Sequence, residues 1–414
     1  MIRFLSVFLF FLLAVPAMAQ TSIGRDSQDY PCLMVDGKVF VPRGYNVLAQ
    51  NQGAPYPSFD TFDAGRFDPA ALQSDFSALQ SGGYNYVRLW LTGYDADDGF
   101  GLSGPGISDA YLANVLRGLQ MARAHGLHVV LTGRFRPGLW LPANYIPAGL
   151  PPENEVGGMN RLLLLPAMAK ATGAFYADLL NRLTQADPGI LSTLLYFDLY
   201  NELHFDLSKP PFNQMAGTYV YAGRTYDLAT PANRQALMDA AGTAWLRTVA
   251  AAVHKADPSL LVTASTFPVA AFGHQGFDGG MLVGKPGRWK PYPLRPAVLL
   301  AGGADLIDIH LYTHPAQNGR TGTASDVLAY LAKGGITPVL AKHVPLIFGE
   351  FGADDLFIAH PGTTLPEMDA TWRALRPLHP AGYALWVLRD GMAVQPQGER
   401  ELLQCFGRGA PVCP

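Results

Sequence analysis

Two glutamates, Glu202 and Glu350, each follow a short apolar stretch of similar form. Glu202 closes LLYFDLYNE at 194–202, and Glu350 comes directly after VPLIFG at 344–349. An apolar strand buried on both faces tolerates a charge best at its rim, so both carboxyl groups are expected at strand ends. One carboxyl group that protonates a leaving oxygen and a second that attacks an anomeric carbon can hydrolyse a glycoside. The alternative is that each glutamate forms a structural salt bridge.

The spacing of the two glutamates favours opposite sides of one barrel. They are 148 positions apart, which is about three βα units at roughly 47 residues per unit. Strands four and seven lie across a barrel of eight strands, so both carboxyl groups can face one central cleft.

Short apolar runs alternate with longer helical patterns along the chain, which is typical of βα units around a parallel sheet. The sequence therefore predicts an α/β fold, a (β/α)8 TIM barrel formed by a single domain over residues 20–414. Eight strands are predicted, at 39–46, 84–91, 127–133, 193–200, 260–265, 306–312, 344–349 and 382–388. Helices are predicted at 108–125, 168–185, 231–255, 324–333 and 365–375.

Three connections are much longer than the usual few residues. They cover 134–167, 203–230 and 266–304, after strands three, four and five, at the end of a barrel where ligands bind. Aromatic rings in such loops can pack against sugar rings, although each can equally pack within its own loop. The aromatic residues concerned are Trp140, Tyr145, Phe205, Phe212, Tyr219, Tyr221, Phe272, Trp289 and Tyr292.

The pattern resembles the clan of (β/α)8 retaining glycosidases, most closely glycoside hydrolase family 5, the cellulase and mannanase family. Asn201-Glu202 after strand four and Glu350 after strand seven resemble the acid/base and nucleophile of that family, and RGYN at 43–46 resembles its first strand. The similarity covers nearly the whole chain after the first twenty residues.

The resemblance also implies roles for four further residues. It implies an arginine that supports the nucleophile, a substrate-site histidine, a tyrosine beside the nucleophile and a tryptophan floor under the sugar. These are Arg88 in YVRLW, His310 and Tyr312 in DIHLY, and Trp386 in ALW.

These placements are physically reasonable. A cation such as Arg88 lowers the pKa of a nearby carboxyl group and so favours an ionised Glu350. Glu202 must keep its proton until it donates, so burial and the negative charge of Glu350 should raise its pKa. Asn201 is suited to hydrogen bond the 2-hydroxyl of the sugar.

The sequence also departs from the family pattern. Family members often carry a histidine after strand three, where this chain has Arg134; that residue could bind an acidic sugar or pair with a loop carboxylate, and we favour the loop carboxylate. A second Asn-Glu pair at Asn154-Glu155 and a further Glu399 follow no apolar strand, so they are not assigned to catalysis.

The first residues predict export. Arg3, an apolar run from 4 to 15 and a small-residue triplet at 17–19 are typical of a signal peptide over residues 1–19, and hence of a secreted or periplasmic protein without a membrane anchor after cleavage. Of the three cysteines, we expect Cys405 to pair with Cys413; the other two pairings with Cys32, or three free thiols, remain open.

The formal net charge of −3 argues against a nucleic-acid partner, which calls for a concentrated basic patch. We therefore expect a monomeric, endo-acting retaining glycosidase that cleaves a β-linked glucan or mannan without metal or organic cofactor. A barrel that binds carbohydrate without cleaving it, and a transglycosylase that uses the same covalent intermediate, are the alternatives.

Overall fold

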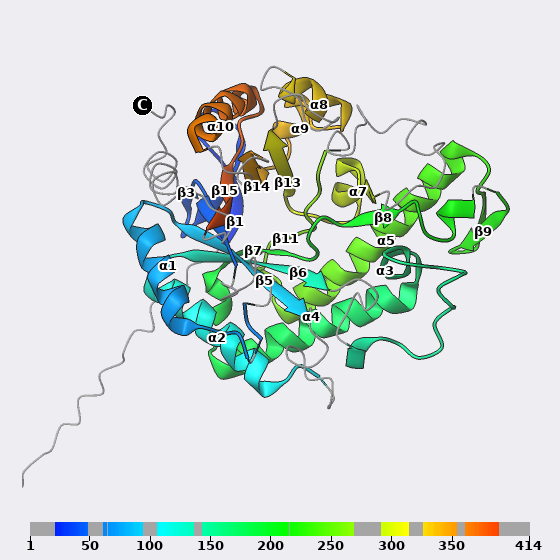
Figure 1. The fold of residues 1–414 in the computed structure, drawn as a ribbon, viewed down its shortest axis with the longest axis horizontal. Helices are drawn as coiled ribbons and strands as arrows, with labels where there is room; N and C mark the ends of the chain where they lie inside the picture. The colour runs from blue at the N-terminus through cyan, green and yellow to red at the C-terminus, as the bar shows by residue number, and fades with distance from the viewer. Residues whose placement is uncertain are drawn as a thin grey trace, which may run out of the picture.

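A computed structural model describes residues 21–48, 61–63, 65–93, 106–135, 143–214, 216–268, 291–313, 326–353 and 361–388. At its centre, eight strands form one sheet in which every neighbouring pair is parallel (Figure 1). In chain order these strands are β4 (Arg43–Val47), β5 (Tyr86–Gly93), β6 (His128–Phe135), β7 (Leu194–Asp198), β11 (Val262–Thr263), β13 (Ile307–Thr313), β14 (Leu346–Ala353) and β15 (Gly382–Leu388).

The sheet curls until its two edge strands, β11 and β13, meet. The backbone N–H of Thr266 donates to the carbonyl of Asp308, and the N–H of His310 donates to the carbonyl of Thr266. The spatial order of the strands follows the chain around the ring, so the predicted (β/α)8 barrel is confirmed.

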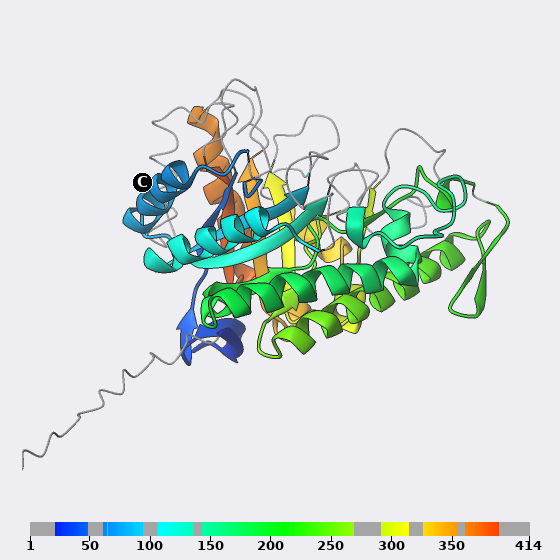
Figure 2. The same ribbon diagram turned by 90° about the horizontal axis from the view of Figure 1, so that it is seen from below.

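The prediction of one first strand at 39–46 was wrong, because the structure has two separate strands there. Residues 39–46 contain Pro42, which has no N–H to donate and separates two strands, β3 (Lys38–Phe40) and β4. β3 pairs with β2 (Pro31–Val35), and β2 with β1 (Thr21–Arg25), in a small antiparallel sheet. Figure 2 shows this sheet, in dark blue, at the end of the barrel where the strands begin. There Leu33 packs with interior residues such as Tyr86 and Ile347 and closes that end.

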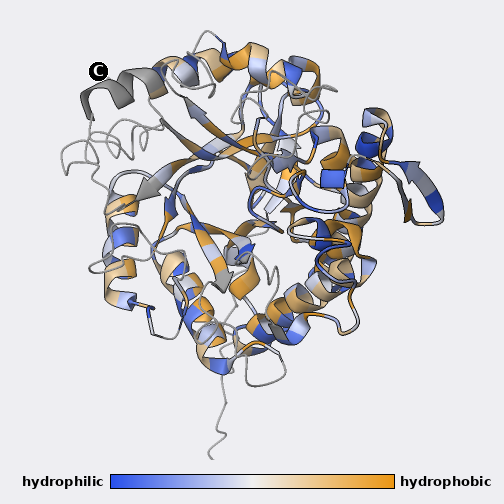
Figure 3. Cartoon of the chain, turned by 45° about the vertical axis from the view of Figure 1, so that its right-hand side comes forward, coloured by the Kyte–Doolittle hydropathy of each residue, from blue (hydrophilic) through white to orange (hydrophobic). Residues whose placement is uncertain are grey.

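Helices surround the barrel strands (Figure 3). Three predicted helices correspond closely to α2 (Asp109–Ala124), α4 (Pro166–Ala186) and α5 (Pro231–Ala256). Two of these helices begin at clear start signals, because Ser108 Oγ caps α2 by accepting from the Tyr111 N–H and Pro231 opens α5. The remaining helices are α1 (Pro69–Ser81), α3 (Asn160–Leu164), α7 (Pro296–Ala301), α8 (Val327–Lys333), α9 (Pro338–Ala341) and α10 (Pro361–Leu375).

The long connections carry structure of their own. After β7, the chain forms β8 (His204–Asp206) and a hairpin of β9 (Thr218–Tyr221) and β10 (Arg224–Asp227). β8 pairs with β12 (Pro291–Pro293), so the connections after β7 and β11 are joined to each other. The predicted connection 266–304 also contains the helix α7, which sequence reasoning missed.

Several predictions lie outside the described residues: the signal peptide over 1–19, Cys405 and Cys413, Glu399, and the aromatic residues Trp140, Phe272 and Trp289. Cys32 is buried in β2 and unpaired among the described residues. Across the described ranges, no helix combines the length and apolar character needed to span a bilayer.

Candidate active site

Glu202 lies four residues beyond the end of β7, in a turn that leaves the barrel. Its backbone has φ 52°, the left-handed region that non-glycine residues seldom adopt. The Glu202 N–H donates to Ser265 Oγ at 2.9 Å, and the Glu202 carbonyl accepts from His204 Nδ1 at 2.6 Å. The side chain is 34% exposed, so it can reach both the barrel interior and a bound substrate.

Glu350 comes from β14 on the other side of the site. β14 extends to Ala353, so Glu350 lies within the strand rather than beyond its end as predicted, and it pairs in register with His310 of β13. Its side chain is only 4% exposed. Oε1 accepts from Arg88 Nη1 at 2.8 Å, and Oε2 accepts from the Tyr312 hydroxyl.

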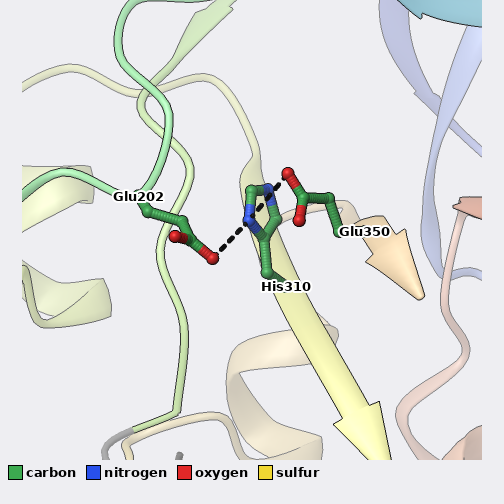
Figure 4. Close-up of side chains that lie close together, drawn as sticks. All are labelled: Glu202, His310 and Glu350. Carbon is green, nitrogen blue, oxygen red and sulfur yellow. Dashed lines mark hydrogen bonds and ion pairs between the residues drawn. The ribbon is translucent and has the colours of Figure 1, made fainter. Parts of the chain in front are cut away.

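His310 links the two glutamates (Figure 4). Its Nδ1 lies 3.0 Å from Glu202 Oε1 and 3.3 Å from Glu350 Oε1. Burial lowers the pKa of His310 to about 4, against the opposing effect of the Glu350 charge. The ring is therefore neutral over most of the pH range, and a single N–H can serve either carboxylate.

The two carboxyl groups have pKa values raised above the ordinary range. Burial raises the pKa of Glu202, while the positive charge of Arg134 opposes this. Burial also raises the pKa of Glu350, and the charge of Glu202 adds to this effect; His310, Arg88 and the Tyr312 hydrogen bond lower it. Arg88 thus acts on Glu350 in the predicted direction, but burial outweighs it.

Arg88 is the centre of a buried hydrogen-bond network. Burial alone would lower the pKa of this guanidinium, but the charges of Asp198 and Glu350 outweigh burial and raise it. Nη1 donates to Asn46 Oδ1 at 3.0 Å as well as to Glu350, and Nη2 donates to Asp198 Oδ2 at 2.6 Å and to Asn201 Oδ1 at 2.9 Å. These bonds hold Arg88 in one orientation toward the Glu350 carboxylate.

A further buried carboxyl group, that of Asp308, supports the backbone beside Glu350. Its Oδ1 accepts from the Gly349 N–H at 2.8 Å and its Oδ2 accepts from the Tyr196 hydroxyl at 2.8 Å. Burial raises the pKa of Asp308 to about 7, and Arg88 opposes this. Asp198 and Asp308 are both fully buried inside the barrel, so the expectation that charges stay at the rim was wrong. Hydrogen bonds and one shared cation stabilise them there.

Aromatic side chains lie next to the acidic cluster. Trp386 of β15 is 7% exposed and packs edge-to-face against Trp90 and Tyr312, with ring centroids 5.8 and 6.4 Å apart. The Arg134 guanidinium lies 5.8 Å from the centre of the Trp90 ring. Two partners were predicted for Arg134, an acidic sugar and a loop carboxylate. The contact with Trp90 is neither of them.

The structure brings all seven predicted site residues into one connected cluster: Arg88, Asn201, Glu202, His310, Tyr312, Glu350 and Trp386. The Asn154-Glu155 pair, by contrast, lies in an exposed turn. Sequence reasoning missed the supporting residues Asn46, Asp198, His204, Ser265 and Asp308. Two of them had a usable signal, because a buried Arg88 within an apolar strand requires an acidic partner, and Asp198 and Asp308 lie within other predicted strands of the same barrel.

The same cluster is also the group of acidic and histidine side chains within the described ranges that could hold a metal ion. One ligand atom each from Glu202, His310 and Glu350 lie within 4.8 Å of one another. Both oxygens of Glu350, however, already accept hydrogen bonds, one of them from the cation Arg88. This donor set is better suited to binding protons and hydroxyl groups than to a cation.

No protein-family model matches the chain, and no curated protein matches its sequence. Solved structures do match its fold. An exo-β-1,4-mannosidase from Opitutaceae bacterium strain TAV5 is 19% identical, with a TM-score of 0.54, over 92% of this chain and 58% of that one. This chain therefore spans little more than half the length of that protein.

Two mannanase structures match over nearly their whole length; one is described as a β-mannanase and the other as an endo-1,4-β-mannanase. The β-mannanase of the blue mussel Mytilus edulis is 14% identical, with a TM-score of 0.54, over 95% of this chain and 97% of that chain. The endo-1,4-β-mannanase of Rhizomucor miehei is 16% identical, with a TM-score of 0.51, over 90% of each chain. At such identities the likeness establishes the barrel fold, the one that the resemblance to glycoside hydrolase family 5 implies.

Proposed function

We propose that this protein is a retaining glycoside hydrolase that cleaves a β-1,4-linked mannan, with Glu202 as general acid/base and Glu350 as nucleophile. The observation that carries the proposal is the approach of the two carboxyl groups around His310, with one oxygen of each within 4.8 Å. Retaining glycosidases place these groups about 5–5.5 Å apart, and inverting enzymes about 6.5–9.5 Å apart, to admit a water. The short separation favours retention.

In the first step, an oxygen of ionised Glu350 attacks the anomeric carbon and the glycosidic C–O bond breaks. Glu202 gives its proton to the departing oxygen, so the leaving group departs as an alcohol. In the second step, Glu202 takes a proton from water, the water oxygen attacks the anomeric carbon, and the bond to Glu350 breaks. Two inversions give net retention, and both glutamates return to their starting states.

The surrounding residues suit these two steps. Arg88 and Tyr312 hydrogen bond the two oxygens of Glu350 and stabilise the ionised nucleophile and the departing carboxylate. Because Arg88 occupies Asn201 Oδ1, the Nδ2 group of Asn201 is the one that can donate to a sugar hydroxyl. Trp386 offers an apolar ring beside Tyr312, suited to the face of a sugar.

Mannan is preferred over glucan because the matching solved structures are described as mannanases and a mannosidase. A polysaccharide is too large to enter a cell, which fits the export signal predicted at 1–19 and a secreted or periplasmic location. We propose endo-cleavage, for which a mixture of oligosaccharides is the expected product.

The direct test is hydrolysis of β-mannan, cellulose and mixed-linkage glucan, with the anomeric configuration of the first product followed by NMR. We expect cleavage of mannan with a β product. Glu350→Ala should abolish hydrolysis, and azide should restore a product of inverted configuration. Normal activity in Glu350→Ala, or an α product from the wild type, would refute the mechanism. Binding of mannan without turnover would instead indicate a carbohydrate-binding barrel, and longer products at high acceptor concentration a transglycosylase.

A further inference from the structure

The backbone of Glu202 has an unusual conformation. A φ of 52° at a long, non-glycine side chain costs free energy and persists only where surrounding contacts impose it. Both the N–H and the carbonyl group of this residue are bound by side chains, those of Ser265 and His204. The conformation is thus held from both sides, by a distant side chain at the N–H and by a nearby one at the carbonyl group.

Ser265 is itself fixed in place. It is fully buried just after β11, and its backbone N–H donates to Asp198 Oδ1 at 2.7 Å. Its hydroxyl lies 3.4 Å from the Tyr200 carbonyl, which can accept its proton, so its lone pairs can accept from the Glu202 N–H at 2.9 Å. Ser265 therefore ties Glu202 to the same buried network that holds Arg88.

His204, the second side chain that contacts the Glu202 backbone, is held in place by its own neighbours. It lies in β8, where it pairs with Pro293 of β12, and its ring packs edge-to-face against Phe267. Burial lowers the pKa of His204 and so favours the neutral ring, while the hydrogen bond to the Glu202 backbone opposes this. Because a carbonyl only accepts, the proton of the neutral ring must be on Nδ1, which donates to the Glu202 carbonyl at 2.6 Å.

We propose that Ser265 and His204 are positioning residues for the general acid, which hold Glu202 in its left-handed conformation so that its carboxyl group faces His310 and the glycosidic oxygen. This inference rests on the proposed function. With either contact removed, the turn at 199–203 can relax to an ordinary conformation, and the Glu202 carboxyl group moves away from the oxygen that it must protonate. A misplacement of about 1 Å can cost about 100-fold in rate.

Leaving-group dependence separates this role from a general loss of structure. A poor leaving group such as phenolate needs its oxygen protonated, whereas 2,4-dinitrophenolate does not. We would measure kcat/KM, which reports the first chemical step, for phenyl and 2,4-dinitrophenyl β-mannobioside with Ser265→Ala and His204→Ala. Each variant should lose about 10- to 100-fold on the phenyl substrate and less than about 3-fold on the dinitrophenyl substrate.

Two reference variants complete the experiment. Glu202→Ala should show the same contrast more strongly. Thr263→Val removes a buried hydroxyl within β11 itself, one that donates to the Leu306 carbonyl at 2.8 Å, and should lower stability without changing the contrast. Should Ser265→Ala not fold, Ser265→Cys retains the size of the side chain and weakens the hydrogen bond.

Equal losses on the two substrates, or no loss on either, would overturn the positioning role. If the wild-type protein cleaves neither aryl substrate and does not cleave mannan, the proposed function itself fails. That result is distinct from a variant in which the ratio of kcat/KM values for the two aryl substrates stays unchanged.

Discussion

Arg88 and Glu350 form an ion pair in which Nη1 lies 2.8 Å from Oε1, and neither side chain is more than 4% exposed. The second nitrogen of the same guanidinium lies 2.6 Å from the buried carboxylate of Asp198. One cation therefore serves a candidate nucleophile and a purely internal carboxylate at once. Removing Arg88 leaves the charges of Asp198 and Glu350 buried without full compensation, and removing one of the carboxylates does the same to the charge of Arg88.

Arg88→Met should consequently lower stability as well as activity. Loss of the cation leaves Asp198 and Glu350 buried without a counter-charge, which we expect to cost about 3–5 kcal/mol of unfolding free energy. Urea denaturation measures the change. The double variant Arg88→Met with Asp198→Asn should recover part of the loss, and a single variant as stable as the wild type would contradict the pairing.

The rate should depend on pH in a bell-shaped manner. The first step needs Glu350 ionised and Glu202 protonated, so kcat/KM falls at low pH as Glu350 gains a proton and at high pH as Glu202 loses one. The Tyr312 hydrogen bond lowers the pKa of Glu350. Tyr312→Phe should therefore move the acid limb of the kcat/KM profile to higher pH and leave the alkaline limb in place. A shift of the acid limb to lower pH would show that Glu350 does not control it.

Asp308 should make stability fall as pH rises. Its pKa is raised from 3.8 to about 7 by burial, so between these values the folded protein holds a proton that the unfolded chain has released. Stability present at acidic pH is then lost as pH rises through about 7, by an amount on the order of a few kcal/mol. Asp308→Asn keeps an acceptor for the Gly349 N–H and should flatten this slope, so that the variant exceeds the wild type in stability at pH 8. Parallel slopes, measured by urea unfolding at pH 5 and pH 8, would exclude this role.

Gly349 is required next to Asp308. A Cβ on Gly349 would overlap the Asp308 carboxyl group, whose Cγ would lie 2.6 Å away. Gly349→Ala should therefore cost about 1–3 kcal/mol or more and displace Glu350, with a corresponding fall in kcat. Gly65→Ala, where an added Cβ meets no atom within 4 Å, is the matched control. Thermal unfolding that is unchanged in Gly349→Ala would contradict the close approach.

Much of the barrel could be predicted because each strand is a short apolar run and each major helix has a start signal. The spacing of Glu202 and Glu350 placed them on strands four and seven, and the structure has β7 and β14 in those positions. Pro42 explains the one strand that was wrong. The six-residue helix α7 was missed because a single apolar turn and a half gives too little periodicity to separate from a loop.

The support of the site could not be predicted in the same way. Asp198 and Asp308 are not indicated by the sequence of their own strands, because a single apolar strand disfavours a buried charge, whereas half of the strand side chains in a barrel face a shared interior. Arg88 supplies the counter-charge there from a third strand. The left-handed backbone of Glu202 depends on the nearby His204 and on Ser265, which is 63 residues away, so the local sequence around Glu202 does not indicate it by itself.

In the proposed mechanism, Glu350 bonds covalently to the sugar. Incubation with a 2-deoxy-2-fluoro-β-mannosyl fluoride should trap this intermediate, because the 2-fluorine slows both chemical steps while the reactive fluoride leaving group keeps formation of the intermediate faster than its hydrolysis. Proteolysis and mass spectrometry should then find one sugar on the peptide that contains Glu350. A label on a different residue, or turnover of mannan with inversion and no labelled peptide, would show that Glu350 is not the nucleophile.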